Sequence, residues 1–169
     1  KQLKQIAAII AEKTDQKPES VMKTLDDRTF IKSLMNKYPD ILTNEILDKN
    51  IKHPLEGYLF PATYSFYKAD PATDEIITKM LDKTEDVIMK YRDQLEGHQL
   101  KTVHQLLTMS SLIEEEATAK ADRHQISSVF YNRMKKGMPL QTDPTVLYAQ
   151  GEHKSRVLYK DLKIDSPYN

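Results

Sequence analysis

Three consecutive glutamates close a segment whose residue types suit acid–base chemistry. The segment reads VHQLLTMSSLIEEEAT over residues 103–118, and residues three or four apart on a helix share one face. With that spacing Val103, Leu107, Ser110 and Glu114 lie along one face of the helix. The first two side chains on this face are apolar, and Ser110 is small and polar. Burial disfavours the charged form of a carboxyl group, so an interior one can stay protonated and act as a general acid. The pattern therefore nominates Glu114 as a catalytic acid that is drawn toward the interior.

The two acids that follow have plainer interpretations. Glu115 lies on a helical line of small and polar side chains, which is typical of a solvent-facing surface. Glu116 lies four residues before Lys120, the spacing of an ordinary surface ion pair. A run of three glutamates is most often a solvated helix face, so this interpretation also stays open for Glu114.

The sequence offers little for other catalytic chemistries. It has no cysteine, and its 5 histidines show no HExxH pattern or other tight ligand spacing, so we expect no metal ion. Ser110 and Ser111 do not lie in a GxSxG motif, which disfavours a serine hydrolase. Only 4 glycines are present and no phosphate-binding glycine motif occurs, so we expect no nucleotide and no cofactor.

Composition narrows the class of protein further. The 169 residues are 39% hydrophobic and 30% charged, which fits a soluble globular chain of about one domain. The 25 basic and 25 acidic residues give a formal net charge of +0, so a nucleic-acid partner is not expected. No long apolar run occurs, and the sequence predicts neither a membrane span nor a signal peptide within the chain.

The pattern of apolar residues predicts a helix-rich α+β fold. Residues 1–50 show several short helical patterns and no catalytic signature, and we interpret them as a small helical region. Residues 55–67 are aromatic-rich and interrupted by Pro61, which favours extended strand or loop and supplies a small β component. Residues 51–169 are then predicted to form the second domain.

Further helices are predicted within that second domain. They run from Asp70-Pro71 to near Gly97, over residues 102–119, over residues 122–136 with Gly137 as a C-terminal cap, and from Asp143 as N-cap with Pro144 at the first position. From the residues alone, Asn132 and Arg133 are either substrate contacts or the polar face of their helix. Asp143 is likewise either a helix cap or part of a cleft.

Four segments carry a family resemblance when they are taken in order. They are LEGYLFPATYSF (55–66), LLTMSSLIEEEA (106–117), SVFYNRMKKGMPLQTDPTVLYAQG (128–151) and DSPYN (165–169). Together they resemble the YceG-like family of endolytic murein transglycosylases, the MltG type. The ordered set is far more specific than any one motif, and LQTDPTVLY is its strongest element.

The resemblance implies roles for particular residues. The family's catalytic glutamate falls in an S-I-I/V-E-x-E motif, which reads here as residues 111–116 and places it at Glu114. Glu116 is the second motif acid and is implied as a substrate-binding residue. The other implied substrate-binding residues are Asn132, Gln141, Asp143, Tyr148, Tyr168 and Asn169. Similarity of residues 137–141 and of Tyr168-Asn169 to motifs of goose-lysozyme-like transglycosylases suggests a lysozyme-like cleft.

The implied activity is cleavage of peptidoglycan glycan strands between N-acetylmuramic acid and N-acetylglucosamine. The product ends would be 1,6-anhydro sugars, and the reaction would terminate or trim nascent strands. The implied location is outside the cytoplasmic membrane, on a single-pass anchor absent from this chain, with penicillin-binding proteins and other wall-synthesis proteins as partners. Family members begin with a membrane helix and a LysM-like region and continue past S-P-Y-N. We therefore expect residues 1–50 to be the end of a LysM-like subdomain and the chain to be a fragment truncated at its C-terminus.

Two alternatives remain at this stage. One is a non-catalytic glycan-binding or scaffolding module of the wall-synthesis machinery. The other is a hydrolytic muramidase in which water attacks with the help of Glu114 and a second acid such as Glu116 or Asp143.

Overall fold

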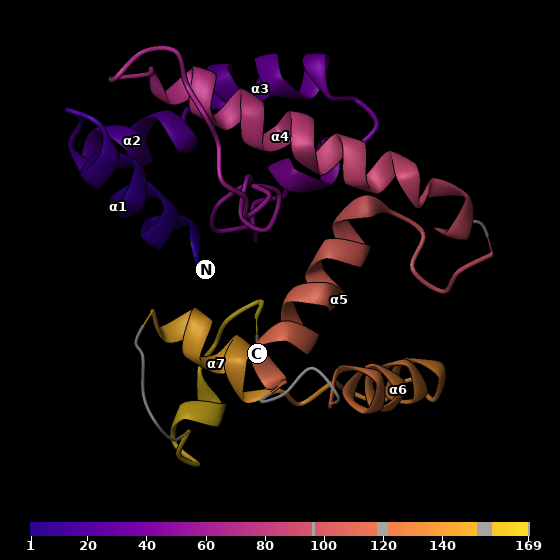
Figure 1. Ribbon diagram of the computed structural model, residues 1–169. Coiled ribbons are helices and arrows are strands. Elements are labelled where there is room, and N and C mark those ends of the chain that lie inside the picture. The colour runs from indigo at the N-terminus through magenta and orange to yellow at the C-terminus, as the bar shows by residue number, and fades with distance from the viewer. Residues whose placement is uncertain (96, 118–121, 152–156, 169) are drawn as a thin grey trace. The chain divides into compact units, whose positions relative to one another are not determined.

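The chain forms helices joined by irregular segments (Figure 1). The computed structural model describes residues 1–95, 97–117, 122–151 and 157–168. They divide into two compact units, residues 1–107 and residues 108–169. The boundary falls inside helix α5 (Val103–Glu116), which therefore begins in the first unit and ends in the second. Within the described part of the chain, no helix has both the length and the apolar composition needed to cross a membrane.

The first unit contains most of the helices. They are α1 (Leu3–Lys13), α2 (Pro18–Leu25), α3 (Arg28–Lys37), the 3₁₀ turn η1 (Asn44–Leu47), α4 (Thr73–Lys90) and the 3₁₀ turn η2 (Arg92–Leu95). Pro18 begins α2, where its missing N–H leaves no hydrogen bond unmade. Asp27 caps α3 by accepting a hydrogen bond of 2.7 Å from the backbone N–H of Phe30. The predicted helical character of residues 1–50 is confirmed.

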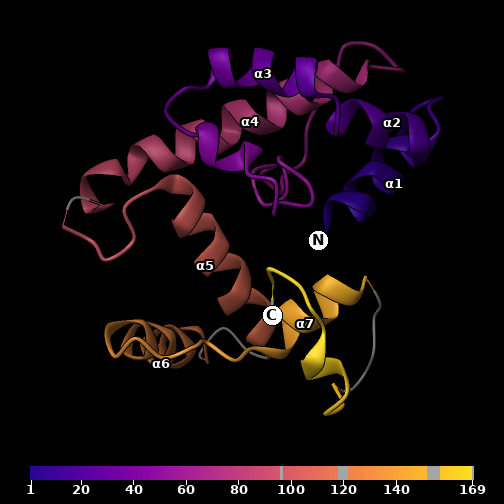
Figure 2. The ribbon, with the colours of Figure 1, turned by 180° about the vertical axis from the view of Figure 1, so that it is seen from behind.

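One apolar core holds the first unit together. Leu3, Ala7 and Ile10 are buried at the i, i+4, i+7 spacing of a helix face, as periodicity predicts. Figures 1 and 2 both show α4, the longest helix, lying along α3. Residues of α4 such as Ile77 and Leu81 are fully buried in the same cluster. Each such side chain contributes about 1.5–3 kcal/mol of transfer free energy when buried.

This core includes residues on both sides of position 50. Leu55 and Tyr58 are buried in the same cluster as Ile41 and Ile46, so residues 51–107 pack with residues 1–50. The division between the compact units falls between residues 107 and 108. The predicted division into a helical region of residues 1–50 and a catalytic domain of residues 51–169 stays a prediction.

The predicted small β component is not seen among the described residues, which contain no strand. The aromatic segment that suggested it forms turns and irregular backbone instead. Its carbonyl groups bind side chains and not a neighbouring strand: Tyr64 donates its hydroxyl to Phe60 O at 2.7 Å, and Lys79 donates to Ser65 O at 2.6 Å. The hydroxyl of Thr84 donates to Tyr58 O. Strand-like composition becomes a strand only when a second extended segment pairs with it.

The N-terminal turns of α5 are held by the first unit. Val103, Leu106 and Leu107 pack against its core. His104 Nδ1 lies 2.9 Å from the hydroxyl of Tyr58, whose ring stacks on the imidazole at 6.1 Å between centroids. These contacts fix the start of the helix whose last three residues are the glutamates.

The second unit is built from the end of α5 and three further elements. They are α6 (Asp122–Lys135), α7 (Asp143–Gln150) and the 3₁₀ turn η3 (Asp161–Lys163). Its helices bury one large apolar side chain each, namely Met109, Phe130 and Val146. Among the described residues, the second unit thus has a small apolar core.

Two turns of the second unit bear on the sequence predictions. Gly137 (φ +65°) ends α6 as predicted: its N–H donates to Met134 O at 3.0 Å, and the N–H of Met138 donates to Arg133 O at 2.9 Å. This pair of hydrogen bonds is the Schellman motif, which favours glycine at the left-handed position. At the start of α7 the prediction was wrong by one residue, because the N-cap is Thr142 and Asp143 is the first helical residue.

Candidate functional site

The predicted catalytic acid lies on the surface of the second unit. The side chain of Glu114 is 61% exposed, and its Oε2 atom is bound by Arg123 of α6, with Nη2 at 2.6 Å and Nε at 2.9 Å. The expectation of an interior position is therefore wrong. The reason lies in the division of α5: Val103 and Leu107 pack on the first unit, but Ser110, next along the same line, is exposed. The buried face of the helix does not continue to its C-terminal end.

Glu116 is the more enclosed of the motif acids. It is the last residue of α5, is half-buried, and accepts a hydrogen bond from the hydroxyl of Thr142. Thr142 is itself 6% exposed. Glu115, between the two motif acids, is exposed as predicted. The surface pairing expected for Glu116 involved Lys120, which lies outside the described residues.

The Glu116–Thr142 hydrogen bond joins two of the motif segments. One is the acidic end of α5, and the other is the Q-T-D-P segment at residues 141–144 that starts α7. Within that segment Gln141 is exposed and accepts a hydrogen bond of 3.2 Å from Arg133 Nη1. Asp143, two residues on, is exposed. Two segments separated in sequence by the whole of α6 are thus brought together.

The remaining predicted residues lie on α6, on α7 and in the last segment. Asn132 is exposed, one residue before Arg133. The ring centroids of Tyr148 and Tyr168 are 5.0 Å apart, and the ring planes are at 67° to each other, which is an edge-to-face arrangement. This contact connects α7 with the D-S-P-Y-N segment. Asn169 lies outside the described residues.

Three side chains organise the site although their spacing in the sequence does not indicate it. Arg123 binds Glu114, Thr142 binds Glu116, and Arg133 binds the segment before α7. A fourth, Asp161, is buried and accepts hydrogen bonds from Gln150 Nε2 at 2.9 Å and from the backbone N–H of Leu158 at 2.8 Å. Each of these pairings joins separate elements, so the spacing of residues within one helix does not predict it.

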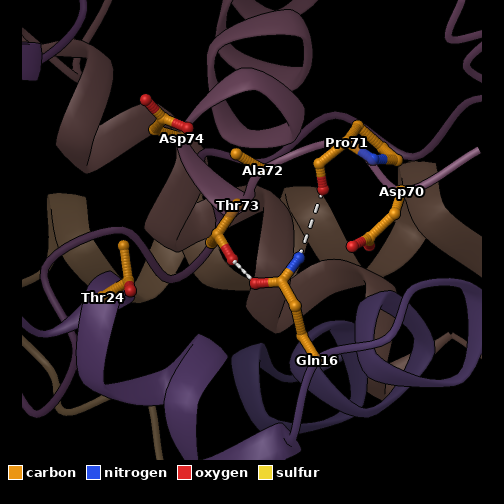
Figure 3. A pocket seen from close by; sticks show the side chains of 7 residues that line it. All are labelled: Gln16, Thr24, Asp70, Pro71, Ala72, Thr73 and Asp74. Carbon is orange, nitrogen blue, oxygen red and sulfur yellow. Dashed lines mark hydrogen bonds between the residues drawn. The ribbon is translucent and has the colours of Figure 1, made fainter. Parts of the chain in front are cut away.

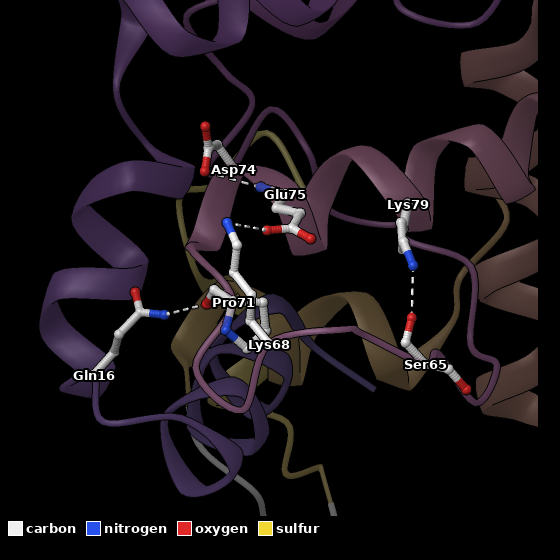
Figure 4. Close-up of polar contacts among 7 residues, drawn as sticks. All are labelled: Gln16, Ser65, Lys68, Pro71, Asp74, Glu75 and Lys79. Atoms are coloured by element: carbon white, nitrogen blue, oxygen red, sulfur yellow. Dashed lines mark hydrogen bonds and ion pairs between the residues drawn. The ribbon is translucent and has the colours of Figure 1, made fainter.

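An open cavity of about 400 Å³ lies in the first unit and contains none of the predicted site residues (Figure 3). Polar groups in it bind one another: Gln16 Nε2 donates to Pro71 O at 3.2 Å, and the hydroxyl of Thr73 donates to Gln16 Oε1. Beside it, Lys68 pairs with Glu75 at 3.8 Å (Figure 4). These contacts join the α1–α2 connection to the start of α4, which is a structural role.

The second unit therefore presents a surface-accessible carboxyl group, that of Glu114, near the end of a helix whose last residue, Glu116, binds the segment before α7. A carboxyl group in such a position can exchange a proton with a bound ligand. Arg123 and Arg133 add two fixed cationic donors on the neighbouring helix.

Comparison with known proteins assigns the chain to a family. All of residues 1–169 match the YceG-like family, and the chain belongs to it. The resemblance seen in the four motif segments is thus confirmed, and the match extends over the N-terminal region as well. The crystal structure of a yceG-like protein from Listeria monocytogenes superposes on the whole chain with a TM-score of 0.94 and 55% sequence identity.

Two relatives share one name, endolytic murein transglycosylase. The endolytic murein transglycosylase of Bacillus subtilis strain 168 is 60% identical over 168 residues, covering 99% of this chain and 46% of the relative. That of Streptococcus pneumoniae serotype 2 strain D39 is 38% identical over 157 residues, covering 89% of this chain and 28% of the relative. The chain spans less than half the length of either relative, and 55% of the Listeria protein.

Proposed function

We propose that the full-length protein is an endolytic lytic transglycosylase of peptidoglycan and that Glu114 is its acid–base catalyst. The names of the relatives support the reaction class. The observation that carries the assignment to the second unit is the hydrogen bond between Glu116 and Thr142, because it unites the acidic end of α5 with the Q-T-D-P segment. Residues 51–169 are proposed to belong to the catalytic region.

In the first step Glu114 is protonated and donates its proton to the glycosidic oxygen. The bond between that oxygen and C1 of N-acetylmuramic acid breaks, the bonding electrons leave with the oxygen, and an oxocarbenium-like centre develops at C1. In the second step the C6 hydroxyl of the same sugar attacks C1. Glu114, now a carboxylate, takes the hydroxyl proton, and the product carries a 1,6-anhydro ring. The proton is returned, so one carboxyl group serves both steps.

A second carboxylate is not required by this reaction. Paired carboxylates in glycosidases supply either a nucleophile or a base that activates water, and here the sugar's own hydroxyl replaces both. Glu116, which binds Thr142, then serves to position the segment that starts α7. The remaining residues are proposed to orient the sugar and to stabilise developing charge: Asn132, Gln141, Asp143, Tyr148, Tyr168 and Asn169.

The contact with Arg123 has a definite place in this scheme. Two nitrogens of its guanidinium bind Oε2 of Glu114, at 2.6 Å and 2.9 Å. We therefore propose that Arg123 orients the Glu114 carboxyl group for both steps.

The test is mass analysis of the fragments that the full-length protein releases from purified peptidoglycan. A lytic transglycosylase gives fragments that are one water lighter than those of a hydrolase. Fragments with ordinary reducing ends would identify a muramidase, and the absence of released fragments would identify a non-catalytic glycan-binding module. Either of these results contradicts the proposal.

The proposed substrate places the protein outside the cytoplasmic membrane. We propose that a segment outside this chain anchors it there, and that penicillin-binding proteins or other wall-synthesis proteins are its neighbours. Protease added to intact protoplasts should digest the catalytic region, and cross-linking in cells should recover wall-synthesis enzymes. A catalytic region protected from protease until the cells are lysed would contradict this location.

A further inference from the structure

Arg133 binds the turn between α6 and α7 through both its side chain and its backbone carbonyl. Its side-chain Nη1 donates to Leu140 O at 2.5 Å, to Gln141 Oε1 at 3.2 Å and to Pro139 O at 3.3 Å. Its own backbone carbonyl accepts the N–H of Met138 at 2.9 Å. One residue therefore contacts four successive residues of the turn, three through the N–H groups of Nη1 and one through its backbone carbonyl.

Gln141, the last of these four residues, has an unusual backbone. Its φ is +54°, and it is the one non-glycine residue with positive φ among those that the structure describes. The left-handed conformation costs an L-residue about 1–2 kcal/mol, and such a conformation persists only where its surroundings hold it. Arg133 holds it on one side, and on the other the buried Thr142 is tied to Glu116.

The contact with Arg133 also decides which way the Gln141 amide faces. A guanidinium has five N–H donors and no acceptor, so only the amide oxygen can face it. The NH₂ group of Gln141 is then directed away from Arg133. It makes no hydrogen bond to any described residue, and the side chain is exposed. Gln141 thus presents a pair of oriented donors at the surface beside the Glu116–Thr142 junction.

We infer that Arg133 is a positioning residue that makes Gln141 a hydrogen-bond donor to an acceptor oxygen of the bound sugar. This inference rests on the proposed function, because it takes a glycan as the ligand. Two sugar oxygens have the required chemistry, the acetamido carbonyl and a ring hydroxyl. In this inference Arg133 binds the turn and acts on the reaction through the position of Gln141.

The first experiment measures whether Arg133 holds the turn. In Arg133→Met, backbone amides of residues 138–142 should exchange hydrogen faster than in the parent. The control is Lys135→Met, which removes a charge from the same last helical turn but involves an exposed side chain; it should leave exchange in the turn unchanged. Unchanged exchange in Arg133→Met would overturn the positioning role, and this result does not depend on any activity.

The second experiment measures kcat/KM of the full-length protein on peptidoglycan. Gln141→Glu keeps an oxygen facing Arg133 but removes the donors, and kcat/KM should fall on the order of tenfold to a hundredfold. The kcat/KM of Arg133→Met should fall by a comparable factor, and that of Arg133→Lys by a smaller one. The double variant Arg133→Met/Gln141→Glu should lose no more kcat/KM than the single variant with the larger loss. Parental kcat/KM in Gln141→Glu would overturn the inference, as would additive losses in the double variant.

A third experiment distinguishes the two acceptor oxygens by comparing normal with N-deacetylated peptidoglycan. Gln141→Met has an uncharged side chain of similar length with no donor. If the acceptor is the acetamido carbonyl, the loss caused by Gln141→Met should disappear on deacetylated strands. If the acceptor is a hydroxyl, the loss should be equal on both. If the parent protein releases no anhydro fragments, the proposed function is wrong. The hydrogen-exchange experiment would still test whether Arg133 holds the turn.

Discussion

Arg123 directs both of its contacts to the same oxygen of Glu114. Nη2 lies 2.6 Å and Nε 2.9 Å from Oε2, and the other oxygen, Oε1, makes no hydrogen bond to any described residue. The carboxyl group is therefore bound to Arg123 through one oxygen, while the side chain as a whole is 61% exposed. In the proposed reaction Oε1 is the atom that exchanges the proton with the sugar.

The first prediction concerns Glu114→Gln in the full-length protein. Glutamine keeps the size of the side chain and an oxygen for Arg123, so folding and glycan binding should survive. It cannot donate a proton to the glycosidic oxygen or take one from the C6 hydroxyl, and the rate should fall by about 10²–10⁴-fold or more. Release of anhydro-muropeptides measures the effect. Glu115→Gln, on the exposed face of the same turn, is the matched control and should stay within a few-fold of the parent.

Arg123→Gln should lower kcat with little change in the stability of the protein. An exposed ion pair contributes about 0.2–1 kcal/mol to stability, whereas the orientation of Glu114 affects the reaction directly. We expect a loss in kcat of roughly tenfold, with Arg123→Lys in between because an ammonium cannot bind through two fixed nitrogens. Arg92→Gln removes a comparable exposed pair in the first unit, Arg92–Asp40 at 3.1 Å, and should not change kcat. A parental kcat in Arg123→Gln would refute the orienting role.

Thr142→Val should destabilise the second unit. Valine has nearly the shape of threonine but no hydroxyl, so Glu116 loses its donor while it stays half-buried. A buried polar group left without a partner costs about 1–3 kcal/mol. Hydrogen exchange at the start of α7 should report this loss, and Thr142→Ser, which retains the hydroxyl, should resemble the parent. Equal exchange in the valine and serine variants would show that the hydrogen bond is not needed.

Glu116→Gln tests the same contact from the other side. The amide oxygen can still accept from Thr142, so folding should be retained. The charge is lost, and if Glu116 also orients substrate the rate should fall by less than in Glu114→Gln. A loss in Glu116→Gln that equals or exceeds the loss in Glu114→Gln would exchange the roles proposed for the two acids.

Alkaline pH should weaken the first unit through Tyr38. Burial, followed by its hydrogen bond to Asp82 at 2.5 Å, raises the pKa of the Tyr38 phenol well above its ordinary 10.0. Because the folded pKa is raised, the stabilising contribution is complete below about pH 10 and is lost as the pH rises through the folded pKa. Tyr38→Phe should be less stable than the parent at neutral pH, where it loses the hydrogen bond, but should lose less stability between pH 9 and pH 12. Denaturant unfolding across that range measures both effects.

The control for this prediction is Tyr67→Phe, because the Tyr67 side chain is fully exposed. This substitution removes an exposed hydroxyl group and leaves the buried Tyr38 in place. The free energy of unfolding of Tyr67→Phe should therefore match that of the parent at every pH. Identical alkaline profiles for Tyr38→Phe and the parent would show that the buried phenol does not govern the transition.

Sequence alone determined the features that depend on neighbours along the chain. The spacing of Leu3, Ala7 and Ile10 predicts the buried face of α1, and Gly137 predicts the end of α6. Helix formation and capping involve residues within one or two turns, so their signals are local. The order of the four motif segments likewise sufficed to identify the family, since it depends only on residue types and their spacing.

Tertiary structure decided the features that depend on distant partners. Glu114 continues an apolar line but is exposed: Leu107 on that line packs against a core, whereas Ser110 and Glu114 do not lie in one. Residues 55–67 have strand-like composition, but no second extended segment pairs with them. The roles of Arg123 and Arg133, and the left-handed backbone of Gln141, arise where separate elements meet. Burial and hydrogen-bond partners are properties of packing between elements, and no periodicity within one element encodes them.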